Sequence, residues 1–323
     1  MRFKAHLLAG FAATVLTGNP VVAGASDSPA PANTVGGVTV TAPQKPDPLV
    51  DRTTEFVRQR LPTSRFEQYA RFRDPICVKV QGLPGQFDAF VAKRIVEVAT
   101  EVHAPVAKAE TCKPNVNVIF SAQPQALLKD IGRRREDLLG FHFMAQMKGL
   151  TTFSRPIQAW YLTQTSDMTG RTTLDVRQTG GVDVMDIVQG GADLGGGEAA
   201  GGSFGPHGRA GSRLSVEMSS ELALSLIIAD AGKVSGQPIG AVADYIAVLA
   251  LSRWQGLERC SGLSTILNLM AQDCGEDPPQ AATSSDLALL TSLYAVDPRE
   301  DGALQRATIA SAVRKAAETD RAH

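Results

Sequence analysis

Apolar side chains follow a helical period over several stretches of the chain. In residues 86–101 they recur every three to four positions, which predicts an amphipathic helix with one face against a core. Residues 239–253 show the clearest pattern, with the larger apolar residues on one face and alanines beside them. The same period predicts four further helices, over residues 51–61, 123–131, 283–295 and 303–317. We expect Thr283 or Ser284 to cap the first turn of the helix at 283–295.

Other stretches alternate or are rich in β-branched residues, which predicts strands. Residues 156–164 begin with Pro156, whose missing N–H is tolerated at a strand start, and residues 171–177 are the expected hairpin partner. Residues 213–229 end in an apolar run that favours a buried strand, although a helix also fits. Shorter strands are expected at 77–80 and 115–120. These elements predict an α+β fold in which helices pack against a mixed, twisted sheet.

The first 25 residues have the features of an export signal. Arg2 and Lys4 give a positive start, and residues 7–16 form a short apolar core. Ala23-Gly24-Ala25 then supplies a small-residue cleavage pattern. The alternative is an amphipathic first helix of the folded domain. Cleavage predicts a periplasmic or secreted protein. No transmembrane segment is expected after it, because no later apolar run approaches the ~20 residues that a membrane helix needs.

Two stretches have compositions that cannot build a core. Residues 26–50 combine five prolines with Ser, Ala and Thr, which predicts a disordered tether. Residues 178–212 contain 12 glycines in 35 positions, which predicts a flexible loop inserted within the domain. Residues 51–318 are then expected to form a single α+β domain around this loop.

Composition and charge narrow the class of protein. The chain has 323 residues, of which 43% are hydrophobic, and this content excludes wholesale disorder. Its 32 basic and 33 acidic residues give a net charge of −1, and loss of Arg2 and Lys4 with the signal makes it −3. Such a balance does not provide the basic footprint of a nucleic-acid-binding protein, so no nucleic-acid partner is expected.

Four cysteines, Cys77, Cys112, Cys260 and Cys274, lie beyond the signal. An even number in an exported chain favours disulfides, and four cysteines allow three pairings. We favour Cys77–Cys112 and Cys260–Cys274, because the members of each pair are close in sequence. The alternative, a four-cysteine zinc site, lacks a C-x-x-C pair.

Few residues offer catalytic chemistry. Residues 201–205 match the G-x-S-x-G spacing of a hydrolase nucleophile, but Ser203 lacks the preceding strand that such a turn requires. His103, His142 and His207 are the histidines available for a site, and none lies within four residues of another, as a helical metal pair would require. His142, between two phenylalanines, is expected in the core or at an interface.

Two groups of side chains offer binding chemistry or surface charge. Trp160, Tyr161 and Tyr245 are candidates to line a groove for a peptide or glycan, although aromatic residues on strands and helices lie more often in a core. Glu217 and Glu221 would share a helix face if their stretch were helical, and a solvated surface pair is the expectation for them.

Three local features follow one another in residues 239–294. These are the helix that reads Ala-Asp-Tyr-Ile-Ala-Val-Leu-Ala-Leu-Ser-Arg over 243–253, the turn over 264–268 and the helix over 286–294. In this order they resemble the matrixin branch of the metzincin zinc peptidases. In that family a helix carries H-E-x-x-H-x-x-G-x-x-H, whose three histidines bind zinc and whose Glu is the general base. The chain is also similar to uncharacterised exported proteobacterial proteins with a zincin-like domain.

The resemblance implies a zincin-like fold without its metal chemistry. Ala243, Ala247 and Arg253 occupy the three ligand positions, Asp244 the position of the base, and Leu267 that of the methionine beneath the metal. Zinc needs at least three N, O or S donors, and two alanines supply none. No metal or other cofactor is therefore expected.

The expected role is that of an exported, catalytically inactive zincin-like domain that binds a partner or serves a structural purpose. The partner would be a peptide held along an edge strand at Arg155–Gln164, or an envelope protein. The alternative is a peptidase-like hydrolase with a non-standard site that uses Asp244, Asp230 or His142.

Overall fold

The computed structural model describes residues 48–64, 66–108, 112–140, 146–167, 170–175, 218–274 and 277–322. All of these residues belong to the unit that runs from Pro46 to His323. The expected signal peptide, the tether up to residue 47 and the Gly-rich loop at 178–212 lie outside the described residues.

An open mixed sheet forms the centre of this unit. Its strands are β2 (Val78–Gln81), β3 (Val116–Ser121), β6 (Ser219–Asp230), β4 (Ile157–Ser166) and β5 (Thr172–Leu174), in this spatial order, with β1 (Arg71–Phe72) beside the start of β6. β1, β2, β3 and β6 run parallel, whereas β4 is antiparallel to β6 and β5 is antiparallel to β4. The predicted mixed α+β architecture and the hairpin between the strands predicted at 156–164 and 171–177 are confirmed.

Strand β6 has neighbours along both edges. β1 and β3 pair with it on one side and β4 on the other, and its residues from Ser219 to Ala229 are all buried. A strand covered on both faces has no solvent side for polar residues, so its sequence does not alternate, and from Leu222 to Ala229 it is apolar at every position except Ser225. The expected buried strand is confirmed, and the helical alternative is wrong.

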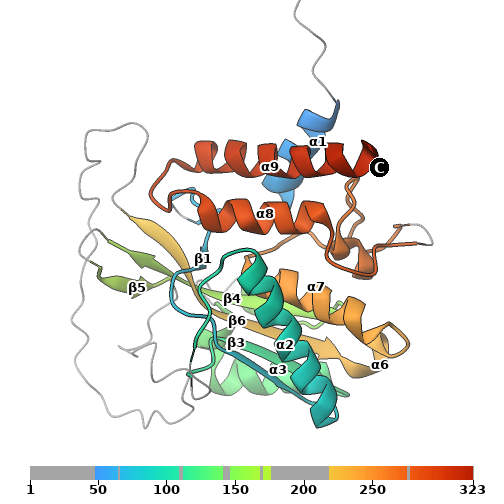
Figure 1. The fold of residues 1–323 in the computed structure, drawn as a ribbon. Helices are drawn as coiled ribbons and strands as arrows, with labels where there is room; N and C mark the ends of the chain where they lie inside the picture. The colour runs from blue at the N-terminus through green and yellow to red at the C-terminus, as the bar shows by residue number, and fades with distance from the viewer. Residues whose placement is uncertain are drawn as a thin grey trace, which may run out of the picture. The chain divides into compact units, whose positions relative to one another are not determined.

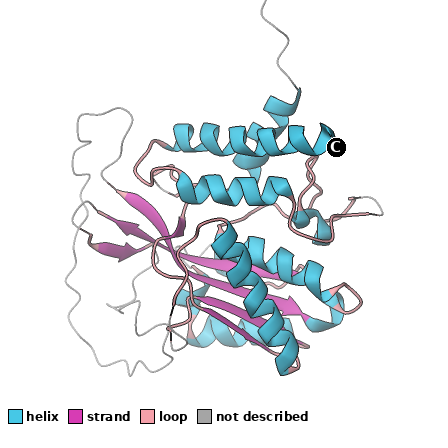
Figure 2. Ribbon diagram, viewed as in Figure 1, coloured by secondary structure: helices cyan, strands magenta, loops and turns pink. Residues whose placement is uncertain are grey.

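Helices cover both faces of the sheet (Figure 1). α2 (Gly85–Glu101) and α7 (Ile239–Leu251) pack side by side on one face, and α3 (Pro124–Arg134) lies on the other with the short helices η1 (Glu136–Leu139) and α4 (Met147–Leu150). Farther from the sheet, α8 (Ser284–Ala295) and α9 (Gly302–Ala322) lie side by side, and α1 (Pro48–Arg60) packs against α9 (Figure 2). The remaining short helices are α6 (Ala231–Val234) and η3 (Ile266–Met270).

The sheet separates two hydrophobic cores. The larger core joins α1, α2, α7, α8 and α9 to one face. The smaller core lies under α3 and η1 and contains Leu128, Leu139, Trp160, Leu162, Leu224, Leu226 and Ile228. Because side chains alternate along a strand, β4 contributes Ile157 to the larger core and Trp160 and Leu162 to the smaller one.

Several helix boundaries differ from those predicted. α1 begins at Pro48, so the last three residues assigned to the tether are helical; proline suits the first helical position, and Leu49 is buried. α7 ends at Leu251, which leaves Arg253 beyond the helix. Thr283 is the N-cap of α8, where its hydroxyl and the carboxylate of Asp286 form a capping box.

Two disulfides join Cys77 to Cys112 and Cys260 to Cys274, and the described residues contain no free cysteine. The favoured pairing is therefore confirmed. In the described part of the chain, no helix combines the length and apolar character needed to cross a bilayer. Both findings are compatible with an exported protein.

Replacing Cys260 and Cys274 together by Ser should lower the free energy of unfolding by about 3 kcal/mol, because the bond closes a loop of 14 residues in the unfolded chain. Urea unfolding of the oxidised protein and the double variant measures the difference. Reductant should lower the midpoint of the native protein and leave a variant lacking all four cysteines unchanged. Equal unfolding of the native protein with and without reductant would contradict the assignment.

Candidate functional site

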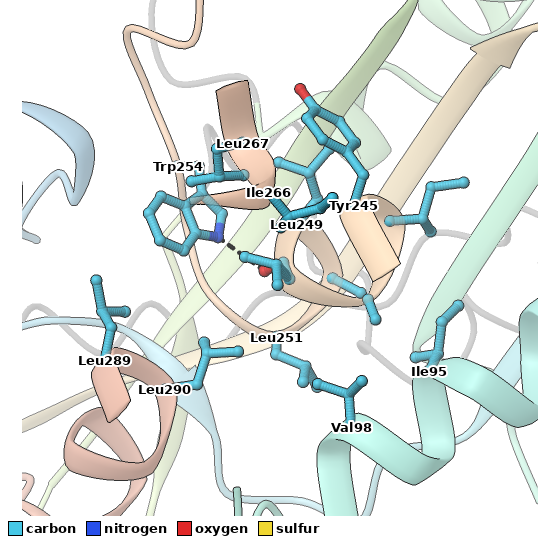
Figure 3. Packing of buried hydrophobic residues seen from close by; sticks show 14 of the residues in the cluster. Ile95, Val98, Tyr245, Leu249, Leu251, Trp254, Ile266, Leu267, Leu289 and Leu290 are labelled. Carbon is cyan, nitrogen blue, oxygen red and sulfur yellow. Dashed lines mark hydrogen bonds between the residues drawn. The ribbon is translucent and has the colours of Figure 1, made fainter. Parts of the chain in front are cut away.

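Helix α7 is the centre of the candidate site, because the resemblance places the metal ligands of a zinc peptidase on it. Every residue from Ala241 to Leu251 is buried. Side chains of α2, η3 and α8 converge on it from different sides (Figure 3). A helix that is apolar all round is typical of the interior of a domain, and Asp244 is the one charged residue of α7.

The C-terminal end of α7 is also buried, and its last four carbonyl groups would otherwise have no partner. Four side chains satisfy them one by one. They are Trp254 Nε1, which donates to the carbonyl of Val248 at 2.8 Å (Figure 3), Tyr161 Oη to Leu249 at 3.0 Å, Ser225 Oγ to Ala250 at 2.9 Å, and Tyr294 Oη to Leu251 at 2.8 Å. Two of these donors come from sheet strands, one from α8 and one from the segment after α7.

The aromatic residues considered for a ligand groove pack in the cores of the domain or donate hydrogen bonds to carbonyl groups there. Trp160 is 3% exposed and donates from Nε1 to the carbonyl of Leu150 at 2.8 Å. Tyr161 uses its hydroxyl on α7, and burial raises the pKa of this phenol. Tyr245 is 1% exposed, and burial raises its pKa to about 12. These positions agree with the core location that the sequence also allowed, and none of the three side chains forms an exposed aromatic surface.

The positions that correspond to zinc ligands offer no metal chemistry. Ala243 and Ala247 are fully buried and carry no donor atom. Arg253 lies past the end of α7, and burial lowers the pKa of its guanidinium. Among the residues that the structure describes, no three His, Cys, Asp or Glu side chains come together in a way that could hold a metal ion. The donor set of this region thus does not fit zinc.

Asp244, at the position of the general base, is bound by two partners. Arg94 of α2 donates two hydrogen bonds to the carboxylate of Asp244, from Nε to Oδ1 and from Nη2 to Oδ2 at 3.2 Å. The backbone N–H of Ala282 also donates to Oδ2, at 2.8 Å. The hydrogen bond to Asp244 is the main cause of the raised pKa of Arg94. Through these hydrogen bonds, Asp244 links α7 to α2 and to the segment before α8.

Sequence reasoning missed Arg94. The signal for it was available, because Arg94 directly precedes Ile95 on the apolar face of the helix predicted over 86–101. A cation beside an apolar face can reach a buried carboxylate, but the sequence does not indicate which carboxylate.

The turn after α7 is fixed by a second buried carboxylate. Asp286 accepts hydrogen bonds from the hydroxyls of Thr265 and Thr283 and from the backbone N–H of Ile266 at 2.8 Å. Burial raises the pKa of Asp286, and these hydrogen bonds oppose the rise. Leu267 is 3% exposed and packs beside α7 in the larger core (Figure 3). The turn is thus filled with apolar side chains.

The other candidate residues do not gather around α7. The carboxylate of Asp230 accepts from the backbone N–H of Gly232 and Lys233 and caps α6. Glu221 is buried and accepts from Gln164 at 3.0 Å, so its expected place in a solvated surface pair is wrong; the start of β6 lies between two strands, not on an exposed helix.

Of the histidine and serine candidates, the structure describes only His103. His103 lies just past the end of α2 and is exposed. His142, Ser203, His207 and Glu217 lie outside the described residues.

Comparison of the chain with protein-family models, with curated proteins and with solved structures finds no match. The structure and its chemistry therefore carry the functional argument.

Tyr161→Phe and Tyr294→Phe should each lower the free energy of unfolding by about 1–3 kcal/mol, because each leaves a buried carbonyl of α7 without a donor. Tyr69→Phe is the matched control: its hydroxyl is buried and has no hydrogen-bond partner, so its removal should be neutral or stabilising. Chemical denaturation of the three variants measures the contrast. Equal losses in all three would show that the hydrogen bonds to α7 contribute no specific stability.

Proposed function

We propose that this chain is an exported zincin-like domain that binds an extended peptide and has no metal-dependent catalysis. One observation carries the proposal. The resemblance assigns two zinc-ligand positions to Ala243 and Ala247, which are fully buried. The carboxylate at the position of the base accepts hydrogen bonds from Arg94 and from the backbone N–H of Ala282.

The order and packing of the elements support the zincin-like assignment. A buried strand, β6, leads to the central helix α7, which is followed by the turn at η3 and then by α8. The last three of these elements carry the resemblance to metzincins, and η3 and α8 both contact α7 in the larger core. The packing thus supports one shared origin for features that are individually generic.

The environment of Asp244 argues against a role in proton transfer. A general base must reach the proton that it removes, through a direct hydrogen bond or one water. Asp244 is 4% exposed, and both of its oxygens accept hydrogen bonds from protein groups. Its interactions are those of a structural residue.

The peptide would add to the sheet along β4. The N–H of Asp230 in β6 donates to the carbonyl of Pro156, so Pro156 and every second residue after it direct their backbone groups to β6. Ile157 and Ala159 consequently direct theirs to the opposite side. Within the described residues, β5 pairs on that side only with Gln164–Ser166.

The free part of this edge is short. Gly140 approaches the carbonyl of Tyr161 so closely that a Cβ at Gly140 would lie 2.3 Å from the oxygen. Among the residues that the structure describes, the N–H and C=O groups of Ile157 and Ala159 are therefore the ones left for a peptide. Adding a strand to an open edge is a common mode of peptide recognition, in which backbone hydrogen bonds supply affinity.

Amide exchange followed by NMR tests this mode of binding. A hexapeptide of alternating threonine and valine, blocked at both ends, should slow exchange of the amides of Ile157 and Ala159 but not of Gln158 and Trp160, whose amides already face β6. Ala159→Pro should abolish the effect because it removes an outward N–H, whereas Ala159→Val keeps the N–H and should preserve it. Protection of all four amides alike, or binding that survives Ala159→Pro, would refute strand addition at β4.

Elemental analysis of the protein, purified from its native envelope without chelator, tests the loss of metal chemistry. We expect zinc far below one atom per chain, because the alanines at the ligand positions supply no donor. Zinc near one atom per chain would contradict the proposal and would favour a peptidase-like hydrolase whose ligands lie elsewhere.

A further inference from the structure

A recess with a volume of about 420 Å³ lies between α1 and the loop that is closed by the Cys260–Cys274 disulfide. Successive turns of α1 form one wall, from Asp51 to Arg60, and the residues from Cys260 to Leu263 form the other. This volume falls in the range of sites for small ligands, roughly 300–1,000 Å³. None of these residues belongs to β4 or α7, so the recess is separate from the region described above.

Arg60 is the buried cation of this recess. Only 7% of the residue is exposed, and within the described residues its side chain makes one hydrogen bond, from Nη2 to the carbonyl of Arg259 at 2.7 Å. No carboxylate in the described part of the chain lies within 4 Å of it. Glu258 acts on Arg60 only from a longer distance, because it pairs with Arg155 at 3.6 Å. Burial lowers the pKa of Arg60, and the more distant carboxylate of Glu258 opposes this effect only in part.

The other charges of the recess do not neutralise Arg60. Glu55 is held by Arg58 at 2.6 Å and also accepts a hydrogen bond from Gln59. Asp51 and Arg52, one charge of each sign, lie exposed in the first turns of α1. A buried charge beside a recess is costly unless an opposite charge pairs with it closely.

We propose that this recess binds a small ligand through a carboxylate group and that Arg60 is its anchor. The planar guanidinium has N–H groups that Arg259 leaves free, and a carboxylate can accept two parallel hydrogen bonds from such a group. A phosphate dianion fits the recess less well, because Asp51 and Glu55 would repel its second charge. The carboxylate can belong to a free organic acid or to the C-terminus of a peptide.

NMR titration of the purified protein tests the proposal through the Nε–H signal of Arg60. N-acetyl-trialanine with a free C-terminus and butyrate, which each carry one negative charge, represent the two sources of the carboxylate, and the C-terminal amide of the same tripeptide is the matched probe without charge. We expect a saturable shift of the Arg60 signal with at least one of the two acids and none with the amide. The peptide used for β4 is blocked at both ends, so failure at either place leaves the other proposal intact.

Arg60→Met should weaken binding of the acid about 10- to 100-fold, the effect of removing a hydrogen bond to a charged group. Arg134→Met, an exposed arginine of α3 outside the recess, is the control and should bind as the native protein does. If Arg60→Met does not fold, the shift of the Arg60 signal in the native protein still decides the question.

Three results would overturn the proposal. These are equal responses to the acid and the amide, unchanged affinity in Arg60→Met, and tighter binding of inorganic phosphate than of either carboxylate. If butyrate alone binds, the ligand is a free acid; if the peptide acid alone binds, it is a C-terminus. Both of these outcomes support the site.

Discussion

Burial of the C-terminal end of α7 is the constraint on which the rest of the structure depends. A helix end inside a core leaves four carbonyl groups that water cannot reach, and each unsatisfied group costs about 1–3 kcal/mol. The donors come from Tyr161 on β4, Ser225 on β6, Tyr294 on α8 and Trp254 after the helix. These bonds fix the sheet, the central helix and the C-terminal helices relative to one another, because none of the three can shift without breaking one of them.

The same burial limits what the molecule can do chemically. A helix enclosed by α2, η3 and α8 leaves its small residues, among them Ala243 and Ala247, without contact with solvent, and a catalytic metal needs an open coordination position for water or substrate. The two buried aspartates, Asp244 and Asp286, are used to hold segments in place. The two binding surfaces that we propose accordingly lie at the periphery, at the edge of β4 and in the recess beside α1.

Much of the fold could be predicted from the sequence because it depends on local pattern. The helical period located α2 and α7, the apolar run identified the buried strand β6, and proximity in sequence selected the two disulfides. Long-range partners could not be predicted in this way. Arg94 and Asp244 are 150 positions apart, and a period shows which face of a helix is buried, not what it meets. For the same reason the role of Tyr161 as a donor to α7 was missed.

The packing of α1 on α9 has a consequence for how the chain acquires its structure. Phe56 and Val57 of α1 and Ile309 and Val313 of α9 are buried in one core, although some 250 positions of sequence separate the two helices. Synthesis proceeds from the N-terminus, so the apolar side of α1 has no native partner until nearly the whole chain has been made. Contacts between such distant segments form late and slowly. Helix α1 is thus among the last described elements to be buried, and during that interval its apolar side is open to chaperones and to aggregation.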